Sequence, residues 1–375
     1  MKPRLNKCAS FFYKLSEIYL VPLRYVLNKI IGRWMTVLTP KEYGNAKTKF
    51  REILIRISLF FVFLLLISPT VVFSILWVVF RLIGDLCLGK QNFLLLKGKY
   101  KGLGNNTFAT WNVASFLPPC TIVDGVAYSN KRTHKIGEQL KEFHFVCSQE
   151  MGGAEARFIS KQLKDHFAEF YTYIGKSHAP FLQSGLFFAS KEPVLNVHWY
   201  PYSVKNMQIV INRSFVIFEL SKYYVAMTHP DSTNNSNIET VRHDEIEQML
   251  NTLEQFQDKP IIFCADLNID RYSSESGYKL LTKKFPDVVL EDYKKCNECK
   301  DLVNHPYCPT SIKSNSCITE TNLLAHNRFN QKGDVECLSI DFISSDKLLI
   351  ELAGSDYFYD VSDHHLIKGK IKKTL

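Results

Sequence analysis

The pattern of apolar and polar positions divides the chain into an apolar N-terminal region and a longer region of alternating strand and helix patterns. Residues 11–31 mix apolar side chains with Lys, Arg and Glu, which predicts an amphipathic helix suited to an interface. Residues 57–80 form a run of 24 residues without a formal charge, which is long enough to cross a bilayer. From about residue 102, short apolar runs alternate with helical periodicity, so we expect a globular α/β domain there.

The apolar segment at 57–83 allows two arrangements in a membrane, a hairpin or a span. Pro69 lies near its middle, where proline removes a helical hydrogen bond and favours a bend. Lys and Arg also flank both ends, whereas a span usually keeps its basic residues mainly on the cytoplasmic side. We therefore expect a helical hairpin that returns to the same face, with a single span or a buried core helix as alternatives.

The net charge of +9 is unevenly distributed. Residues 1–101 hold 17 Lys and Arg against four acids, whereas residues 102–375 hold 29 against 33. A nucleic-acid enzyme would carry the basic excess on its catalytic part, whereas an anionic membrane attracts basic residues beside apolar segments. We therefore predict a basic, membrane-associating helical region at 1–101, a catalytic domain at 102–375, and no nucleic-acid partner.

Composition supports a large core and gives no disulfide framework. Hydrophobic residues make up 46% of the chain, with 27 Phe and 18 Tyr, which argues against extensive disorder. Ten cysteines are too few for a disulfide scaffold in a chain of this length. Four of them are irregularly spaced, so we expect loop thiols rather than a structural zinc site. These four are Cys296, Cys299, Cys308 and Cys317.

The most informative stretch is the apolar run at 261–264, which reads as a buried strand and leads into Asp266 and Asn268. The two-residue period of a strand would point both polar side chains to the same side. A carboxylate and an amide at the end of a buried strand need a partner such as a metal, a phosphate or a polar network. The alternative is an Asx-turn that only closes the strand.

Other polar side chains also lie in or just after strand-like runs. Such groups can meet at one rim of a sheet and leave a site for a hard divalent cation, and few protein ligands beside a phosphate would suit Mg²⁺. A carboxylate beside an imidazole could make that imidazole a general base, although a loop histidine with satisfied hydrogen bonds would look the same. The residues in question are Asn112, Glu150, His229, Asp266, Asn268, Asp341, Asp363 and His364.

Together these stretches resemble the endonuclease/exonuclease/phosphatase superfamily of metal-dependent phosphodiesterases, over residues 104–375. The matching blocks follow the order of that superfamily: TWN (110–112), QE (149–150), SGL (184–186), SKEP (190–193), TH (228–229), ADLN (265–268), IDF (340–342) and SDHH (362–365). The run at 183–193 makes the chain most similar to the membrane-bound neutral sphingomyelinases of animals, the type-2 enzymes in particular. The resemblance implies an α/β fold, a four-layer DNase I-like sandwich with an N-terminal helical membrane-associated segment.

The resemblance also implies roles for the residues of these blocks. Glu150 would be the Mg²⁺ ligand, with Asn112 beside it, and Mn²⁺ would be a substitute ion. Asp266 and Asn268 would orient the water and the scissile phosphate. His229 would stabilise the phosphoryl oxygens.

Four further positions complete the implied site. Asp363 would hold His364, the general base, and Asp341 would support the network. Arg213 stands where relatives have a Lys, so the resemblance implies that it binds substrate, with a geometry that differs from that of Lys. Ala265 replaces the usual Gly, a small change that we expect to fit.

The predicted function is therefore Mg²⁺-dependent hydrolysis of sphingomyelin to ceramide and phosphocholine at a membrane surface. We expect the basic N-terminal region to bind anionic phospholipids and the catalytic domain to face the cytosol. An inositol-lipid phosphatase would want a Trp-Cys-Asp-Arg-like block where this chain has residues 338–342, and the mildly acidic catalytic part disfavours a nuclease. A catalytically silent scaffold is disfavoured because all the expected chemical groups are present.

Overall fold

The computed structural model describes residues 1–26, 46–102, 105–115, 130–175, 184–203, 212–231, 237–269, 275–287, 311–313, 336–338, 341–356 and 366–374. Within these ranges, most strands belong to two mixed sheets. The larger sheet has the order β1 (Leu94–Lys97), β4 (Glu169–Thr172), β5 (Phe187–Ser190), β3 (Phe145–Met151), β2 (Thr107–Ser115), β14 (Leu366–Thr374) and β13 (Leu348–Asp356). The smaller sheet has the order β12 (Asp341–Ser345), β9 (Ile261–Asp266), β8 (Tyr224–Thr228), β7 (Ser214–Glu219) and β6 (Asn196–Pro201). A separate pair joins β10 (Ser311–Lys313) to β11 (Glu336–Leu338).

The two larger sheets pack face to face over a core rich in aromatic side chains. Alternate residues of each strand point inward, so Phe108, Phe145 and Phe188 of the larger sheet meet Phe218 and Met227 of the smaller one. The rings of Phe188 and Phe218 stack across the interface with centroids 4.0 Å apart. The inter-sheet core therefore rests largely on aromatic packing.

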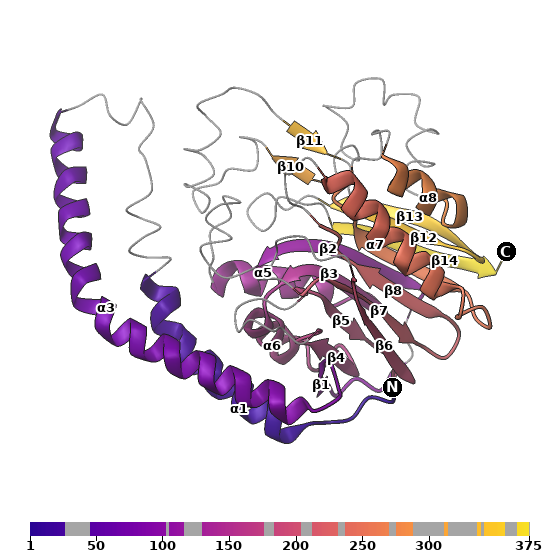
Figure 1. The fold of residues 1–375 in the computed structure, drawn as a ribbon, viewed down its shortest axis with the longest axis horizontal. Helices are drawn as coiled ribbons and strands as arrows, with labels where there is room; N and C mark the ends of the chain where they lie inside the picture. The colour runs from indigo at the N-terminus through magenta and orange to yellow at the C-terminus, as the bar shows by residue number, and fades with distance from the viewer. Residues whose placement is uncertain are drawn as a thin grey trace.

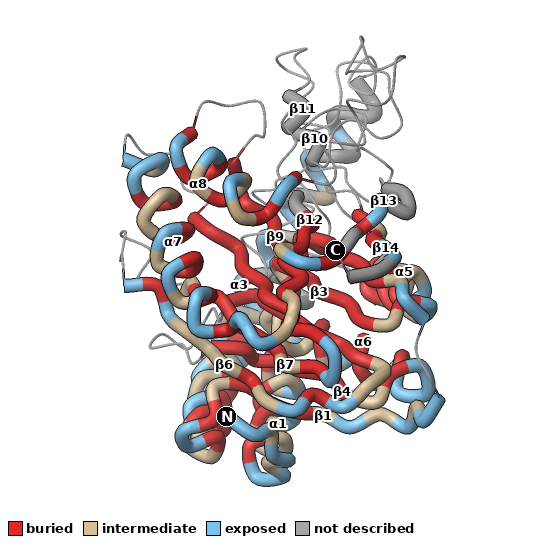
Figure 2. The backbone as a smooth tube through the Cα atoms, turned by 90° about the vertical axis from the view of Figure 1, so that its right-hand side faces the viewer, coloured by how far each residue is buried: buried red, intermediate tan, exposed pale blue. Residues whose placement is uncertain are grey.

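Helices cover both outer faces of the sheet pair. α5 (Asn130–Leu140) and α6 (Gly153–Gln162) pack against the larger sheet, and α7 (Ile238–Leu253) and α8 (Ser276–Lys284) pack against the smaller one. Figure 2 shows these helices on opposite sides of a buried centre. The predicted four-layer α/β sandwich is therefore confirmed.

The smaller sheet contains a β-hairpin that leads into His229. β7 and β8 pair antiparallel, and the backbone N–H of Leu220 donates to the carbonyl of Tyr223, so Ser221 and Lys222 form the two-residue turn. The helix α7 presents Ile246 and Met249 to the outer face of this sheet.

The N-terminal region forms two long helices, α1 (Lys7–Tyr25) and α3 (Ala46–Leu88). The predicted amphipathic helix at 11–31 corresponds to α1, which starts four residues earlier and continues through Pro22; residues 27–31 lie outside the described part. The prediction of a helical hairpin within 57–83 is wrong, because α3 runs without interruption through Pro69. One missing hydrogen bond bends a helix without reversing it, and Figure 1 shows α3 as a curved, continuous helix.

The helices dock on the edge of the larger sheet through an aromatic and charged cluster. The ring of Tyr13 stacks on that of Tyr173, with centroids 4.1 Å apart and planes 5° from parallel. The guanidinium of Arg81 lies 4.7 Å from the first ring and 4.2 Å from the second. The hydroxyl of Tyr13 donates to Asp85 at 2.5 Å. β1 pairs with β4 and so belongs to the larger sheet. The boundary expected at residue 101 between the N-terminal region and the catalytic domain therefore lies after the first strand of the sandwich.

α3 also exposes an apolar stripe. One stretch of the described residues, Ser68–Leu88, is long and apolar enough to cross a membrane, with a mean hydropathy of 2.2 and 28% of it buried. Its exposed side chains recur at helical spacing along one face: Val71, Val72, Ile75, Val79, Leu82 and Leu86. The N-terminal half of α3 extends away from the sandwich in Figure 1.

Candidate active site at the rim of the two sheets

The parallel strand pairs of the two sheets bring four predicted site residues to one rim. β2 runs parallel to β3 in the larger sheet, and β8 runs parallel to β9 in the smaller one. Asn112 and Glu150 lie near the carboxyl ends of the first pair, and His229 and Asp266 lie at those of the second. Parallel strands place their carboxyl ends at the same edge, and the stacked sheets place the two edges side by side.

Three of these side chains form a cluster that could hold a metal ion. One ligand atom each from Glu150, His229 and Asp266 lies within 4.8 Å of the other two. His229 Nε2 is 3.6 Å from Glu150 Oε1 and 3.5 Å from Asp266 Oδ2. The Asp266 side chain is fully buried and that of Glu150 is 18% exposed, which leaves the cluster open on one side. Two carboxylates and an imidazole fit a divalent cation with open positions for water or substrate.

The carboxylate of Asp266 is fixed by hydrogen bonds at both of its oxygens. Asn112 Nδ2 donates to Oδ2 at 2.7 Å, and the backbone N–H of Asn268 donates to Oδ1 at 2.9 Å. The second bond is the Asx-turn that the sequence offered as an alternative to a functional carboxylate. One oxygen of Asp266 therefore closes the turn while the other faces the cluster, so the turn does not exclude a functional carboxylate.

The two-residue strand period, on which the prediction for Asp266 and Asn268 rests, does not extend past Asp266. β9 ends at Asp266, and Asn268 has a left-handed backbone with φ 52°, so the two-residue period no longer applies there. Its amide Nδ2 instead donates to the carbonyl of Pro230 at 3.0 Å. In this structure Asn268 fixes the loop that follows His229.

Unusual backbone conformations gather at this rim. Ala114, Glu150 and Asn268 have φ of 42°, 53° and 52°, values that non-glycine residues rarely adopt. Ala114 lies in the bulge that interrupts the pairing of β2 with β3, and its N–H donates to Asn112 Oδ1 at 2.9 Å. Such conformations cost about 1–3 kcal/mol each and persist where the surroundings fix them, which is common at functional sites.

Comparisons with known proteins agree with this geometry. A family model described as the endonuclease/exonuclease/phosphatase family matches residues 109–364, a range that includes every rim residue above. The chain belongs to the endonuclease/exonuclease/phosphatase family. Members of this family are hydrolases, so the rim cluster is the candidate hydrolytic centre.

Solved structures with a similar fold include three that the chain covers almost completely. A beta toxin from Staphylococcus aureus is 16% identical with a TM-score of 0.53, over 72% of this chain and 100% of the toxin. Sphingomyelinase C from Streptomyces griseocarneus is 14% identical with a TM-score of 0.50, over 72% and 100%. SmcL is 14% identical with a TM-score of 0.51, over 72% and 99%. At these identities the likeness shows the fold alone. A comparison with curated proteins found no match.

Arg213, for which the resemblance implies a substrate-binding role, contacts the loop that begins at His229. Its Nη1 donates to the carbonyl of His229 at 3.1 Å and to that of Pro230, and its Nη2 lies 3.7 Å from Asp231 Oδ1. Together with Asn268, it fixes the backbone that carries the His229 side chain. A lysine has one ammonium group and could not make these contacts in the same planar geometry.

Behind that loop lies a buried network that the sequence interpretation missed. Glu245 Oε2 accepts from the backbone N–H of Asp231 at 2.9 Å, and Arg242 Nη1 donates to the Asp231 carbonyl at 3.4 Å. Arg242 also makes a bidentate ion pair with Glu275. Burial raises the pKa of Glu245 to about 7, although Arg213 opposes the shift. The sequence does contain a signal for this network, because Arg242 and Glu245 are charged residues at positions on the apolar face of α7.

A second missed residue holds the end of β2. Arg132 on α5 is buried, and it donates to the carbonyls of Val113 at 2.7 Å and Ala114 at 2.9 Å. These contacts fix the bulge beside Asn112. No pattern in the sequence distinguishes this arginine from a solvent-exposed one at the start of a helix.

Three of the predicted residues are described only in part or not at all. Asp363 and His364 lie outside the described residues. The backbone register of β12 with β9 places Asp341 directly opposite Asp266. That is the position in which a residue supporting Asp266 is expected.

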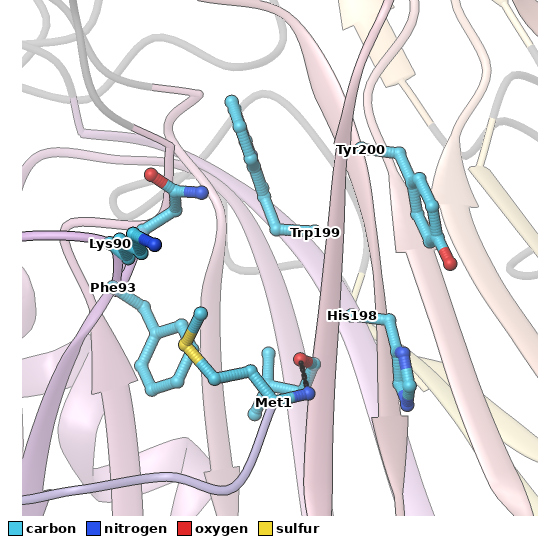
Figure 3. Close-up of a pocket in the computed structure, with 8 residues that line it drawn as sticks. Met1, Lys90, Phe93, His198, Trp199 and Tyr200 are labelled. Carbon is cyan, nitrogen blue, oxygen red and sulfur yellow. Dashed lines mark hydrogen bonds between the residues drawn. The ribbon is translucent and has the colours of Figure 1, made fainter.

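A separate hollow lies away from the rim cluster. It has a volume of about 200 Å³ and is lined by His198, Trp199 and Tyr200 of β6 together with Met1 and Phe93, as Figure 3 shows. The amine of Met1 donates to the carbonyl of Val197 at 2.9 Å beside it. The hollow has no carboxylate in its lining, so it does not resemble a site for a divalent cation.

Proposed function

We propose that the chain is a Mg²⁺-dependent neutral sphingomyelinase that hydrolyses sphingomyelin to ceramide and phosphocholine at a membrane surface. The observation that carries the proposal is that one chain combines the Glu150–His229–Asp266 cluster of a family hydrolase with a long apolar helix docked on the same sandwich. A hydrolase of this family with a lipid substrate needs its site held at the interface, and α3 supplies apolar surface for that purpose. Specificity for sphingomyelin is inferred from the resemblance over residues 183–193.

The proposed chemistry assigns a task to each rim residue. Glu150 would hold Mg²⁺ with Asp266 and His229 within reach, and the bound ion would polarise a phosphate oxygen. Asp266 is fixed at both oxygens, so it can orient the attacking water, with Asn112 keeping it in position. His229 would stabilise the phosphoryl oxygens as the P–O bond to ceramide breaks.

The remaining steps fall to residues of the last family block. His364, oriented by Asp363, would take the proton from the attacking water, and Asp341 would support Asp266 from the neighbouring strand. Arg213 would act by positioning the His229 loop, since its guanidinium is occupied by carbonyls of that loop.

Membrane association would combine apolar contact with charge. The exposed stripe of α3 would insert into the apolar part of the membrane, and the basic N-terminal region would attract anionic phospholipids, at about 1 kcal/mol per Lys or Arg near the surface. We propose that the sandwich faces the cytosol.

The direct test is a substrate panel. The purified full chain with Mg²⁺ is offered sphingomyelin, phosphatidylcholine, phosphoinositides and DNA under identical conditions. We expect preferential release of phosphocholine from sphingomyelin. Release of inorganic phosphate from phosphoinositides, or cleavage of DNA, would instead assign the chain to another activity of the same family. The Asp266→Asn variant is the control for a contaminating enzyme.

A further inference from the structure

Two buried hydrogen-bond donors of the smaller sheet lie next to the candidate active site without a partner. They are the indole Nε1 of Trp199 and the hydroxyl Oγ of Ser214, and neither has a hydrogen-bond partner in the part of the chain that the structure describes. Ser214 as a whole is 1% exposed. Burying a donor without a partner costs free energy, so nearly all such groups in proteins are hydrogen-bonded. These two donors can therefore serve an acceptor that comes from outside the chain.

The two donors converge on Gly175, which follows the end of β4. The backbone of Gly175 has φ 78°, a conformation that favours glycine, and its N–H donates to the carbonyl of Asn92 at 2.8 Å. A Cβ atom built on this residue would lie 3.1 Å from Trp199 Nε1 and 3.5 Å from Ser214 Oγ. One position in front of Gly175 is therefore close to both donors, at separations that suit the oxygen of a hydrogen-bond acceptor.

Both donors come from the face of the smaller sheet that packs on the larger one. Ser214 lies four residues before Phe218 on β7, and Phe218 belongs to the core between the sheets, so the two-residue period gives Ser214 the same direction. Trp199 also packs against that core. Figure 3 shows its ring on the opposite side of β6 from Tyr200. The indole and the hydroxyl thus point towards the larger sheet, where Gly175 lies.

The strand registers relate this position to the metal cluster. β7 and β8 pair Phe215 with Thr228, so the same register places Ser214 level with His229, and β6 is one strand further away. In the larger sheet, β5 separates β4 from β3, the strand of Glu150. Neighbouring strands lie about 4.8 Å apart. The position in front of the glycine is therefore beyond the phosphoryl group that the cluster would bind, and in reach of a substituent on that phosphate.

The chemistry of the two donors indicates which group they would bind. Both can donate a hydrogen to the same atom, so the preferred ligand atom has two lone pairs and no hydrogen of its own. A carbonyl oxygen meets this requirement, whereas a hydroxyl oxygen would bring a hydrogen that needs a further acceptor.

We propose that Trp199 and Ser214 form a subsite for the acyl carbonyl oxygen of a lipid substrate. In sphingomyelin this oxygen belongs to the amide of the ceramide part, which is linked to the phosphate through a short run of carbon atoms. The inference rests on the proposed function and adds two residues that help to select its substrate. Both donors act on the bound lipid and not on the reacting phosphorus, so their contribution lies in substrate binding.

The test is a comparison of two substrates in detergent micelles with Mg²⁺, using the full chain. Trp199→Phe and Ser214→Ala each remove one donor and keep most of the side-chain shape. Each should raise KM for sphingomyelin about three- to tenfold and leave kcat near that of the parent. Sphingosylphosphocholine has the same phosphocholine and hydroxyl groups but no acyl carbonyl. Its KM should be the same for the parent and both variants.

A matched variant and a folding measurement accompany this comparison. Tyr200→Phe removes a hydroxyl from the opposite face of the same strand and should keep the parent KM for both substrates. Melting temperatures show whether the variants are folded. An equal rise in KM for both substrates would overturn the proposal, because it would indicate a structural role. Unchanged KM for sphingomyelin in Trp199→Phe and Ser214→Ala would also overturn it, because the donors would then hold only a buried water molecule.

A second measurement is independent of turnover. The Asp266→Asn chain is labelled with ¹⁵N-tryptophan and titrated with sphingomyelin micelles, and the Trp199 indole signal is identified by its absence after Trp199→Phe. This signal should move downfield as the N–H gains an acceptor, whereas that of Trp111, which is fully buried, should stay. A shift without cleavage of sphingomyelin by the parent would leave the subsite standing and reject the reaction. Cleavage without a shift would reject the subsite and leave the reaction standing.

Discussion

Asn112 and Asp266 belong to different sheets, and their side chains meet at 2.7 Å. Asn112 lies within β2, the strand of the larger sheet that leads to the bulge at Ala114, and Asp266 is the last residue of β9. The hydrogen bond therefore joins the two layers of the sandwich at the candidate active site. Its geometry depends on the packing of the whole inter-sheet core.

The first prediction concerns Asp266. The Asp266→Asn variant should lower phosphodiester turnover by roughly 10²–10⁴-fold, because the neutral amide cannot orient and polarise the water as a carboxylate does. The introduced amide can accept from only one of its two present donors, so we expect a loss of about 1–3 kcal/mol in unfolding free energy. Turnover and urea unfolding are the measurements.

Two comparisons complete that experiment. Asn112→Ala removes one orienting hydrogen bond and leaves the carboxylate, so its turnover should fall less, by about ten- to a hundredfold. Both variants should bind phospholipid vesicles as the parent does. Unchanged turnover in Asp266→Asn would contradict the assignment of this carboxylate to the reaction.

The place of Asp266 at a strand end on the shared rim was predictable from sequence, whereas the backbone conformation of Asn268 was not. A buried apolar run followed by a carboxylate indicates a strand end, and the other strand-end groups indicate a shared rim. The two-residue period holds only while the strand continues, and the left-handed φ of Asn268 ends it. The sign of φ at a single residue depends on its tertiary contacts. For Asn268 the contact is the hydrogen bond from its side-chain amide to the carbonyl of Pro230.

The continuity of α3 shows a similar limit. Pro69 is a local signal for a bend. Whether the chain only bends there or reverses its direction depends on what packs beside the helix. α1 lies along the second half of α3, with Tyr19 and Phe12 stacked on Phe80. Those contacts join residues about sixty positions apart, which no local pattern reports. Arg242 and Glu245, in contrast, could have been found as charged residues on the apolar face of α7.

The second prediction concerns the metal. Mg²⁺ should raise the melting temperature of the full chain, since an ion at a hundred times its dissociation constant stabilises the folded state by about 2.7 kcal/mol. Removing divalent ions with EDTA should abolish turnover, and added Mg²⁺ should restore it. The measurement is thermal unfolding with and without the ion.

Glu150→Gln provides the matched variant. The Gln side chain has the same size as that of Glu, but its amide oxygen is a weaker metal ligand than a carboxylate. The increase in melting temperature caused by Mg²⁺ should therefore disappear in this variant. Glu247, exposed on α7, is the control position, and Glu247→Gln should keep the full shift. An equal shift in Glu150→Gln and in the parent would place the ion elsewhere.

The third prediction concerns pH and the buried carboxyl of Glu245. Burial raises its pKa to about 7, from an ordinary value of 4.5, with Arg213, Asp231 and Arg242 as its charged neighbours. Between those two values the folded state binds a proton that the unfolded state has lost. Stability is therefore lost as pH rises through this window, by about 1.4 kcal/mol for each unit of pKa shift.

Glu245→Gln should flatten this dependence, because the amide does not ionise and its oxygen can still accept from the N–H of Asp231. Urea unfolding of the parent and the variant at a series of pH values gives the two slopes. Glu247→Gln should follow the parent. Parallel slopes in all three proteins would show that Glu245 titrates at its ordinary pKa.

The fourth prediction concerns two cysteines at the junction of the N-terminal helices. Cys8 at the start of α1 and Cys87 at the end of α3 have their sulfur atoms 2.7 Å apart. The surrounding backbone is fixed by hydrogen bonds from Asn6 Nδ2 to the Cys87 carbonyl and between Arg4 and Gln91 in both directions. A mild thiol oxidant such as diamide should therefore form a disulfide between them without rearranging the helices.

Peptide mapping by mass spectrometry under non-reducing conditions identifies the bond. The internal control is the pair Cys147 and Cys264, which is buried in the inter-sheet core and should stay reduced in the folded protein. Cys8→Ser should abolish the new bond and leave Cys87 as a free thiol. The bond would hold the first turn of α1 against the last turn of α3, so hydrogen exchange at the start of α1 should slow in the oxidised protein. Formation of the Cys147–Cys264 bond in its place, with no change at α1, would contradict this arrangement of the helices.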